Sequence, residues 1–319
     1  MQDSAAESNR PAPLVSVITA TYNWSSVLRY AIQSVLWQTL QDFEMLIIGD
    51  GCTDDSAEVV ASFQDPRLRW HNLPENSGHQ SVPNNTGLAM ARGKYVAYLG
   101  HDDLWYPTHL ASLVNELEKA NADIANSVCL VIGPPGSGVR RLTGTSPIWI
   151  PPSCVMHRRS LVSEIGYWKK YTELHIDPER DFLYRAGLNG SRFVIVKNVT
   201  AFKFPSAWRR DSYRERRCDE QAEYARRIQR EPDFLEREII EAAVAYEQGK
   251  TWGPLHGVKR PRFTPPGWEI EQQRRFRGVD ARSLAPLTAV QRILLFLYPF
   301  TFPIRKIRRA VMRLAQRGS

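Results

Sequence analysis

Residues 43–56 read FEMLIIGDGCTDDS, a short apolar run that ends abruptly in small and acidic residues. A run of this length, bounded by turn residues, is typical of a strand buried on both faces of a parallel sheet. The Gly and Asp residues that follow favour a tight turn. The stretch therefore predicts a buried strand at 43–48, a polar turn at its carboxyl end and a helix at about 57–63.

The same strand-and-helix unit recurs on both sides of this stretch. Strands are expected at 14–20, 43–48, 68–70, 95–99, 123–128 and 191–196, and helices at 27–36, 57–63, 82–91 and 109–121. This alternation predicts an α/β fold with a mostly parallel, doubly wound sheet and flanking helices. The Gly- and Pro-rich stretch 133–138 is expected to be a flexible loop.

Beyond this part the sequence changes character. Residues 209–248 are charged and favour helices, with a break at Pro232, and residues 252–268 are Pro-rich, as in a linker or covering loop. The expected organisation is a disordered tail at 1–13, the α/β domain at 14–210, a helical and Pro-rich extension at 211–285 and a basic amphipathic segment at 286–319.

The chain is basic, with a formal net charge of +8 and a pI near 9.4. Six basic residues and no acidic residue lie between 302 and 319, so part of the excess charge sits in the C-terminal tail. A nucleic-acid-binding protein instead needs a basic face with interleaved aromatic residues on its folded domain. We therefore expect no nucleic-acid partner and a tail suited to an anionic surface.

Three features bear on where the protein works. Residues 1–13 lack an apolar signal core and the four cysteines form no C-x-x-C pair, so a cytoplasmic, reducing location is expected. The apolar run at 293–304 is too short to span a membrane and contains two prolines. With the basic tail it fits peripheral contact at the inner face of the membrane. Packing on its own domain or on a dimer partner is the alternative.

Four motifs fall at the predicted strand ends. They are Thr21-Tyr22-Asn23, IIGDGCTD at 47–54, NTGLAMARG at 85–93 and YLGHDD at 98–103. In this order, over about the first 210 residues, the chain resembles family 2 glycosyltransferases of the GT-A fold. The resemblance implies inverting transfer of a sugar from a nucleoside-diphosphate sugar to a hydroxyl acceptor, assisted by Mn²⁺ or Mg²⁺. A UDP-sugar is the favoured donor, with GDP- and TDP-sugars as alternatives. The implied acceptor is a bacterial polysaccharide, a lipid-linked glycan or a small molecule.

The resemblance also implies a donor site. Its candidate residues are Thr21, Tyr22, Asn23, Asp50, Asn85 and His101. A carboxylate such as Asp50 can accept hydrogen bonds from the nucleotide base. A histidine in a polar loop is often only hydrogen-bonded, so His101 is either a ligand or a structural residue.

The turn after residue 48 departs from the family pattern. Family members usually begin this turn with two acidic residues, and here the first is Gly49, which leaves the base preference open. Asp54 either steadies the turn or caps the helix that begins near Ser56.

The family's D-x-D metal motif aligns with Gly100-His101-Asp102, so its first carboxylate is missing. By resemblance Asp102 contacts the divalent cation, and Asp103 holds a metal-bound water or the sugar. Mg²⁺ and Mn²⁺ can be held by one or two carboxylates together with substrate phosphates, so the loss weakens the site without abolishing it. Alternatively, both aspartates cap the helix that follows.

Inversion needs a base that removes the proton from the acceptor hydroxyl. In the family this residue opens a helix, in an acidic pair a few positions before an arginine. Counting back from Arg185 places Glu179 at the base position and Asp181 at the next acidic position, with Asp177 as a third candidate. Carboxylates in a first helical turn are also ordinary partners of the helix dipole, which is the alternative for each of them.

Two further points stay open. Residues 149–158 are expected beside the acceptor, where Trp149 either faces the sugar or packs in the core. The changes at Gly49 and Gly100 also allow a catalytically impaired sugar-nucleotide-binding protein, although a pure binding protein needs no base. Metal-dependent transfer distinguishes the two functions.

Overall fold

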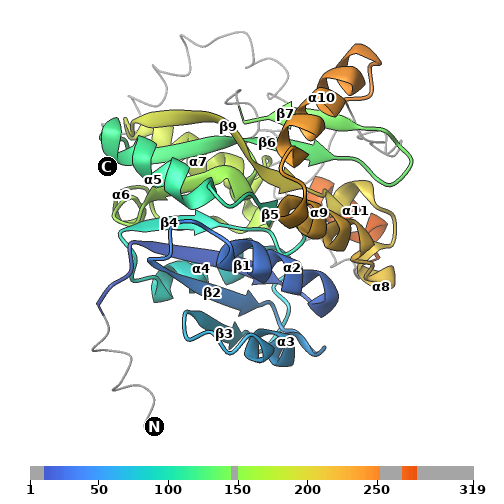
Figure 1. The fold of residues 1–319 in the computed structure, drawn as a ribbon. Helices are drawn as coiled ribbons and strands as arrows, with labels where there is room; N and C mark the ends of the chain where they lie inside the picture. Colours follow the sequence, from blue (N-terminus) through green and yellow to red (C-terminus); the bar gives the residue numbers. More distant parts are fainter. Residues whose placement is uncertain (1–10, 145–149, 252–267, 279–319) are drawn as a thin grey trace, which may run out of the picture.

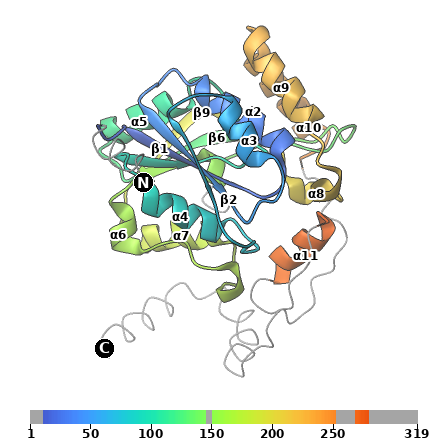
Figure 2. The same ribbon diagram turned by 90° about the horizontal axis from the view of Figure 1, so that it is seen from below.

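The structure is a computed structural model that describes residues 11–144, 150–251 and 268–278. Within these residues one nine-stranded sheet forms the centre of the molecule (Figure 1). Helices α2, α3 and α5 lie on one side of the sheet, and α4, α6 and α7 lie on the other (Figure 2). The α/β class predicted from the sequence is confirmed.

The sheet has a parallel half and a mixed half. Its strands are β1 (Val15–Thr21), β2 (Phe43–Gly49), β3 (Leu68–Asn72), β4 (Tyr95–Tyr98), β5 (Leu104–Trp105), β6 (Ile124–Ile132), β7 (Arg140–Thr143), β8 (Val155–Arg158) and β9 (Phe193–Lys203). Their order is β3-β2-β1-β4-β8-β6-β9-β5, with β7 paired to β6. Strands β1 to β4 run parallel, as the sequence predicts. In the other half β6 and β9 are parallel, whereas β5, β7 and β8 run antiparallel to their neighbours.

The helices expected before residue 122 are present within about two residues of their predicted bounds. The helices are α2 (Ser25–Leu36), α3 (Ser56–Ser62), α4 (Ser81–Met90), α5 (His109–Lys119), α6 (Leu161–Ile165), α7 (Pro178–Leu188), α8 (Ser212–Glu215), α9 (Asp219–Arg230), α10 (Phe234–Glu247) and α11 (Trp268–Phe276). Short 3-10 turns lie at Pro152–Cys154, Tyr171–Glu173 and Ser206–Trp208. The break expected at Pro232 separates α9 from α10.

The register of the parallel half brings three strand ends to one edge. Thr21 at the end of β1 pairs with Gly49 at the end of β2, and Ile18 pairs with Tyr98 of β4. Every residue of β2 and β4 is buried, which agrees with the apolar runs in the sequence. Ligands of open α/β sheets bind beyond the carboxyl ends of the strands, so candidate site residues meet at this edge.

The stretch 133–138 is a defined hairpin turn rather than the expected flexible loop. The Gly133 N–H donates to the Val139 carbonyl (2.9 Å), and Ile132 of β6 pairs with Arg140 of β7. Strand β7 is short and contains two arginines, so it lacks the apolar alternation that predicts a strand.

Helices after residue 210 share a second hydrophobic core with the sheet. The core residues from the sheet side are Leu104, Val128, Leu130, Ile132, Val199, Phe202 and Phe204, and those from α9 and α10 are Tyr224, Ala225, Ile228, Phe234 and Ala242. Because these side chains bury one another, α9 and α10 pack directly against the sheet.

Several predictions concern residues outside the described parts of the chain. They are the role of Trp149, the Pro-rich stretch 252–267 and the C-terminal segment 286–319 with its apolar run. Among the helices that the structure describes, none combines the length and the apolarity needed to cross a bilayer.

Candidate active site

Asp50 follows β2 and is 5% exposed at the edge of the sheet. Its Oδ1 accepts a hydrogen bond from the Ser77 backbone N–H (2.9 Å), and its Oδ2 accepts one from the Asn76 side-chain amide (3.1 Å). Burial raises the pKa of Asp50, while hydrogen bonds from Ser77 and the charge of Arg274 act in the opposite direction. Each oxygen keeps lone-pair capacity, so this fixed carboxylate can accept a further hydrogen bond from a nucleotide base.

The residue before Asp50 has no room for a side chain. A Cβ at Gly49 would lie 2.4 Å from Oδ1 of Asn72 and 2.7 Å from the ring of Trp70. Asn72 accepts a hydrogen bond from the Cys52 N–H and donates one to the Cys52 carbonyl, both at 2.9 Å. The Asn72 amide therefore fills the space of the expected first acidic residue and holds the turn closed.

Asn23 connects the end of β1 to the turn after β2. Its φ of 44° lies in the left-handed region, which Asn tolerates better than most residues. Its Oδ1 accepts hydrogen bonds from the backbone N–H groups of Thr53 (2.7 Å) and Asp54 (3.3 Å). Asp54 in turn accepts from the N–H groups of Ser25 (3.0 Å) and Ser56 (3.3 Å), at the starts of α2 and α3. Asp54 thus contacts both the turn and two helix starts.

His101 joins the end of β1 to α8. Its Nδ1 lies 2.8 Å from Oγ1 of Thr21, and its Nε2 lies 3.1 Å from the hydroxyl of Tyr213. Burial lowers the pKa of His101, against the opposing charge of Asp102, so the ring is neutral at pH 7. Because both ring nitrogens have protein partners, His101 orients Thr21 and Tyr213. Tyr213 lies far along the chain, and the sequence alone gave no signal for it.

Aromatic rings flank His101. The ring centroid of Trp24 lies 5.7 Å from His101 and 5.2 Å from Tyr213, and the half-buried Tyr22 lies 6.3 Å from Tyr213. Such rings present flat apolar surfaces on which a base or sugar can stack.

Asp102 and Asp103 follow β4, are both buried, and differ in their hydrogen-bond partners. Asp103 is fully buried, and its carboxylate accepts hydrogen bonds from Ser153 Oγ (2.5 Å), Lys203 Nζ (3.0 Å) and the Phe204 N–H (3.1 Å). Burial alone would lower the pKa of Lys203, but Asp103 and Asp102 raise it, so Lys203 stays charged. Asp102 is 8% exposed, and its carboxylate accepts no hydrogen bond from the described part of the chain. Asp102 is therefore the carboxylate open to a ligand.

Asp102 is the candidate residue for holding a cation at this edge. Within residues 11–144, 150–251 and 268–278, no three His, Cys, Asp or Glu side chains come together in a metal-binding group. A Cβ at Gly100 would lie 2.9 Å from Oδ2 of Asp103 and 3.2 Å from Oδ1 of Asp102. This arrangement fits a Mg²⁺ or Mn²⁺ ion that takes its other ligands from water and a diphosphate.

The three acidic candidates near the start of α7 differ in their partners. Oε2 of Glu179 is buried and accepts no hydrogen bond from the described residues. Burial, reinforced by the charge of Asp177, raises the pKa of Glu179 to about 7. Asp181 instead forms an ion pair with Arg185 (2.8 Å). Burial also raises the pKa of Asp177, which precedes the helix. Glu179 is therefore the carboxylate best suited to take up a proton at neutral pH.

Lys203 connects the α7 acids with the strand-end residues. Its charge lowers the pKa of both Glu179 and His101, and Asp102 raises the pKa of Lys203 itself. Such effects decline with distance, so Lys203, which pairs with Asp103 at 3.0 Å, is electrostatically linked to all three side chains. Lys203 lies at the end of β9, and no motif in the sequence pointed to it.

Asn85 is engaged with the backbone of Trp168. Its amide donates to the Trp168 carbonyl (2.8 Å), and its Oδ1 accepts from the Trp168 N–H (3.0 Å). The Trp168 indole in turn donates to the Tyr98 hydroxyl (3.1 Å). Asn85 thus ties α4 to the chain leading to α7, and a direct contact with a nucleotide would compete with these bonds.

The fold and this site define an α/β protein of the GT-A class. The fold is similar to that of TarS 1-349 from S. aureus in complex with UDP-GlcNAc, with a TM-score of 0.53 and 19% identity over 76% of this chain and 74% of that chain. The family model for glycosyl transferase family 2 matches residues 16–186, more than half of the chain. The chain therefore belongs to glycosyl transferase family 2, and the resemblance noted from its motifs is confirmed.

Curated relatives match over a shorter region. Poly(ribitol-phosphate) beta-N-acetylglucosaminyltransferase TarP from Staphylococcus aureus is 39% identical over 114 residues, which are 34% of this chain and 35% of that protein. Glycosyltransferase GlyG from Streptococcus pneumoniae is 31% identical over 113 residues, covering 35% of this chain and 37% of that protein. The chain thus spans well under half the length of these relatives.

Proposed function

We propose that this chain transfers a sugar, with inversion, from a nucleoside-diphosphate sugar to a hydroxyl acceptor, and that Glu179 is the base. The main support for this proposal is Glu179 itself: its Oε2 is buried and has no hydrogen-bond partner among the described residues, and the pKa of its carboxyl group is raised to about 7. A carboxylate with a pKa near the working pH is well suited to remove a proton and release it later.

In the proposed reaction Glu179 takes the proton from the acceptor hydroxyl. The acceptor oxygen forms a bond to the anomeric carbon of the donor sugar, and the bond from that carbon to the diphosphate breaks on the opposite face. Asp181 does not act as a second base, because Arg185 holds its carboxylate. It positions the first turns of α7, from which Glu179 projects.

The donor would lie along the strand ends. Asp50 accepts hydrogen bonds from the base, and Thr21, Tyr22 and Asn23 border the nucleoside. A UDP-sugar is the first donor to test, since TarS forms a complex with UDP-GlcNAc and TarP is named as an N-acetylglucosaminyltransferase. GDP- and TDP-sugars are the alternatives.

A divalent cation would be held by Asp102. When bound there, Mn²⁺ or Mg²⁺ neutralises part of the charge that develops on the leaving diphosphate. Asp103 supports this arrangement indirectly, because its carboxylate fixes Lys203 beside Asp102. Lys203 is a permanent positive charge of the site, whether or not the cation is present.

The deciding experiment compares binding with transfer. Purified chain is screened by thermal shift with UDP, GDP, TDP and CDP, with and without Mn²⁺, and release of nucleoside diphosphate is then measured with the matching sugar donor and simple sugars or polyols as acceptors. Glu179→Gln should keep the nucleotide-dependent shift and lose about 100-fold or more of transfer. Glu173→Gln, an exposed residue five positions after Trp168, should keep both.

Two results would count against the proposal. Glu179→Gln with wild-type transfer would exclude Glu179 as the base. Nucleotide binding by the wild type without transfer to any acceptor would favour the catalytically impaired binding protein. Asp102→Ala should abolish the part of the thermal shift that depends on Mn²⁺. A shift that stays metal-dependent in this variant would place the cation elsewhere.

The acceptor and the cellular location belong to the same proposal. We expect a glycan or lipid-linked acceptor and a cytoplasmic enzyme that contacts the inner face of the membrane through residues 286–319. Co-sedimentation with vesicles containing anionic lipid tests the contact, and removal of residues 286–319 should abolish it.

A further inference from the structure

Helix α11 lies far beyond the family match at 16–186, yet it is joined to the candidate site. The Asp211 N–H donates to the Phe276 carbonyl, and the Tyr213 N–H donates to the Arg277 carbonyl, both at 2.9 Å. These bonds attach the C-terminal end of α11 to α8. The two helices lie side by side in both views (Figure 1, Figure 2).

One arginine of α11 reaches the turn beside Asp50. Arg274 is 6% exposed and donates to the Gly78 carbonyl, next to Ser77, whose N–H donates to Asp50. Its charge also counteracts the burial that raises the pKa of Asp50. Glu271, one turn earlier, lies 3.7 Å from Arg274 and offsets its charge. Arg274 is thus a compensated cation that fixes α11 to the turn at residues 77–79.

A second arginine follows one turn later, on the side of His101. The guanidinium of Arg277 lies 5.5 Å from the ring centroid of Tyr213, whose hydroxyl lies 3.1 Å from Nε2 of His101. Its Nη1 donates to Ser206 Oγ (3.4 Å), and its Nε donates to the Gln273 carbonyl (3.2 Å). Within the described residues it forms no ion pair with a carboxylate, and it is only half-buried. Among the residues that the structure describes, Arg277 is therefore a half-buried cation without a carboxylate partner.

Arg274 lies beside the Asp50 turn, and Arg277 lies beside Tyr213, the partner of His101. The pKa of His79 is lowered to about 3, mainly by burial and further by the positive charges of Arg277 and Arg274. A nucleoside diphosphate carries its negative charge between the base and the sugar, while the strand edge offers only Asp102 to hold a cation. A guanidinium can donate two parallel hydrogen bonds to phosphate oxygens.

We propose that Arg277 binds the diphosphate of the sugar donor and that Arg274 is a positioning residue that keeps α11 over the donor site. This inference rests on the proposed function. It adds a donor-binding residue that directly follows α11, outside the family match, and it divides the neutralisation of the diphosphate between a protein cation and the metal at Asp102.

The test measures binding with the full chain by isothermal titration calorimetry. The probe is whichever of UDP, GDP, TDP and CDP binds the wild type most tightly, together with its nucleoside, each in Mn²⁺ and in EDTA. Arg277→Gln should weaken diphosphate binding about tenfold to 100-fold in both conditions, as expected for the loss of charge-assisted hydrogen bonds, and leave nucleoside binding unchanged. Arg275→Gln, on the exposed face of the same helix, is the matched control and should stay within about twofold of the wild type.

The binding affinities distinguish failure of the inference from failure of the proposed function. Equal diphosphate affinities for Arg277→Gln and the wild type overturn the inference, and so does an equal loss for the nucleoside, which would indicate a displaced helix. If Arg277→Gln does not fold, Arg277→Lys is tested in its place. A diphosphate affinity of Arg277→Lys between those expected for the wild type and for Arg277→Gln supports the inference. A diphosphate affinity equal to that of the wild type in EDTA contradicts the need for a guanidinium group. If none of the four diphosphates binds the wild type, the proposed function itself fails, and this inference fails with it.

Discussion

Glu179 and Asp181 lie two positions apart at the start of α7, yet their carboxylates have different partners. Arg185 holds Asp181 in an ion pair at 2.8 Å. Glu179 has no such partner, and the nearby Asp177 disfavours its charged form. The difference separates a structural carboxylate from one that can exchange a proton near neutral pH.

This contrast predicts the pH dependence of transfer. The base must be deprotonated, and the pKa of Glu179 is raised to about 7, so kcat/KM should fall about tenfold per pH unit below that value. Because Asp177 raises this pKa, Asp177→Asn should move the acid limb of the profile to lower pH. The measurement is kcat/KM between pH 5 and pH 9 for both proteins. An acid limb at the same pH in both would show that Asp177 does not set the pKa of the base.

Gly100 gives a second prediction for a single residue. Restoring the family carboxylate with Gly100→Asp would place a Cβ 2.9 Å from Oδ2 of Asp103 and add a third negative charge beside Asp102 and Asp103. We expect a loss of about 1–3 kcal/mol in the free energy of unfolding without metal, because of the close contact and the repulsion. Urea unfolding with and without Mn²⁺ measures this. A variant as stable as the wild type in EDTA would contradict the crowding argument.

At this scale local sequence patterns supplied the candidates: Asp50 and Asp102 follow predicted strands, and Glu179 lies in an acidic stretch shortly before Arg185. Their hydrogen-bond and ion-pair partners in the structure differ from those of Asp103 and Asp181. Tyr213, Lys203 and Arg277 had no such pattern. They are recognised by their contacts with residues far away in the chain, such as Lys203 with Asp103, Tyr213 with His101 and Arg277 with Ser206, and a single sequence carries no record of such contacts.

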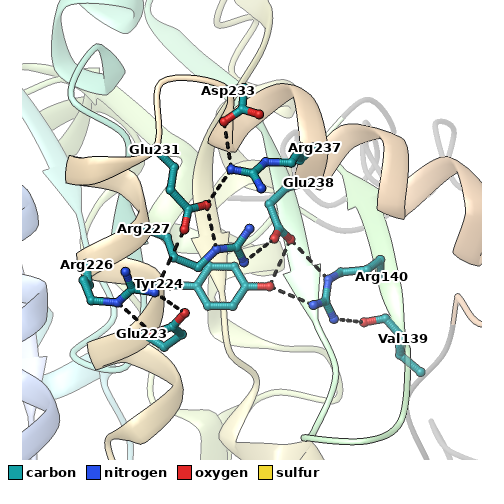
Figure 3. A network of polar contacts seen from close by, with 10 residues as sticks. All are labelled: Val139, Arg140, Glu223, Tyr224, Arg226, Arg227, Glu231, Asp233, Arg237 and Glu238. Atoms are coloured by element: carbon teal, nitrogen blue, oxygen red, sulfur yellow. Dashed lines mark hydrogen bonds and ion pairs between the residues drawn. The ribbon is translucent and has the colours of Figure 1, made fainter.

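At the scale of elements, a network of buried charges attaches α9 and α10 to β7 (Figure 3). Glu238 of α10 is 2% exposed and accepts hydrogen bonds from Arg227 (2.7 Å), the Tyr224 hydroxyl (2.9 Å) and Arg140 (3.3 Å). The carboxylate thus joins two arginines from different elements. Removing it would leave both guanidinium groups without their buried partner.

Glu238→Ala should therefore lower the free energy of unfolding by about 2–3 kcal/mol, a value reduced from that of a fully buried pair because both arginines are partly exposed. Glu241→Ala, an exposed residue on the same helix, should change it by less than about 0.5 kcal/mol. Equilibrium unfolding in urea compares the two. If both variants unfold with the same midpoint, the network contributes nothing to stability.

The sequence did not predict strands β5 and β7, because neither shows a hydrophobic periodicity. Strand β5 has two residues and β7 has four, and each depends on pairing with a distant strand. The strands of the parallel half were found because burial on both faces gives a continuous apolar run. Strand direction in the mixed half, by contrast, depends on tertiary pairing that no local signal reports.

For the whole molecule, buried histidines set the response to acid. Burial lowers the pKa of His79, His109 and His157 from 6.5 to about 3, about 3 and about 4. Below about pH 6.5 the unfolded chain binds protons that the folded chain excludes, so the free energy of unfolding falls by up to ~1.4 kcal/mol per pH unit for each histidine. Burial lowers the pKa of His101 as well. Carboxyl groups act in the opposite direction, because burial raises the pKa of Glu179 from 4.5 to about 7 and also raises the pKa values of Asp50, Asp103 and Asp177.

The contribution of the histidines lowers the free energy of unfolding at pH 5.5 relative to pH 7.5. His109→Gln should reduce the dependence of unfolding free energy on pH, whereas His71→Gln, at an exposed position, should leave it unchanged. Urea unfolding at several pH values measures the slope for each protein. A slope that is the same in His109→Gln and the wild type would show that His109 is not excluded from protonation in the folded state.

The position of β9 inside the sheet limits where the chain can be truncated without disrupting the fold. The family match ends at residue 186, but β9 begins at Phe193 and lies between β6 and β5, in the interior of the strand order. A fragment cut at the family boundary would lose an inner strand and expose an unpaired edge of β6, which invites aggregation. The part of the chain that the family model matches is thus smaller than the part that must fold together.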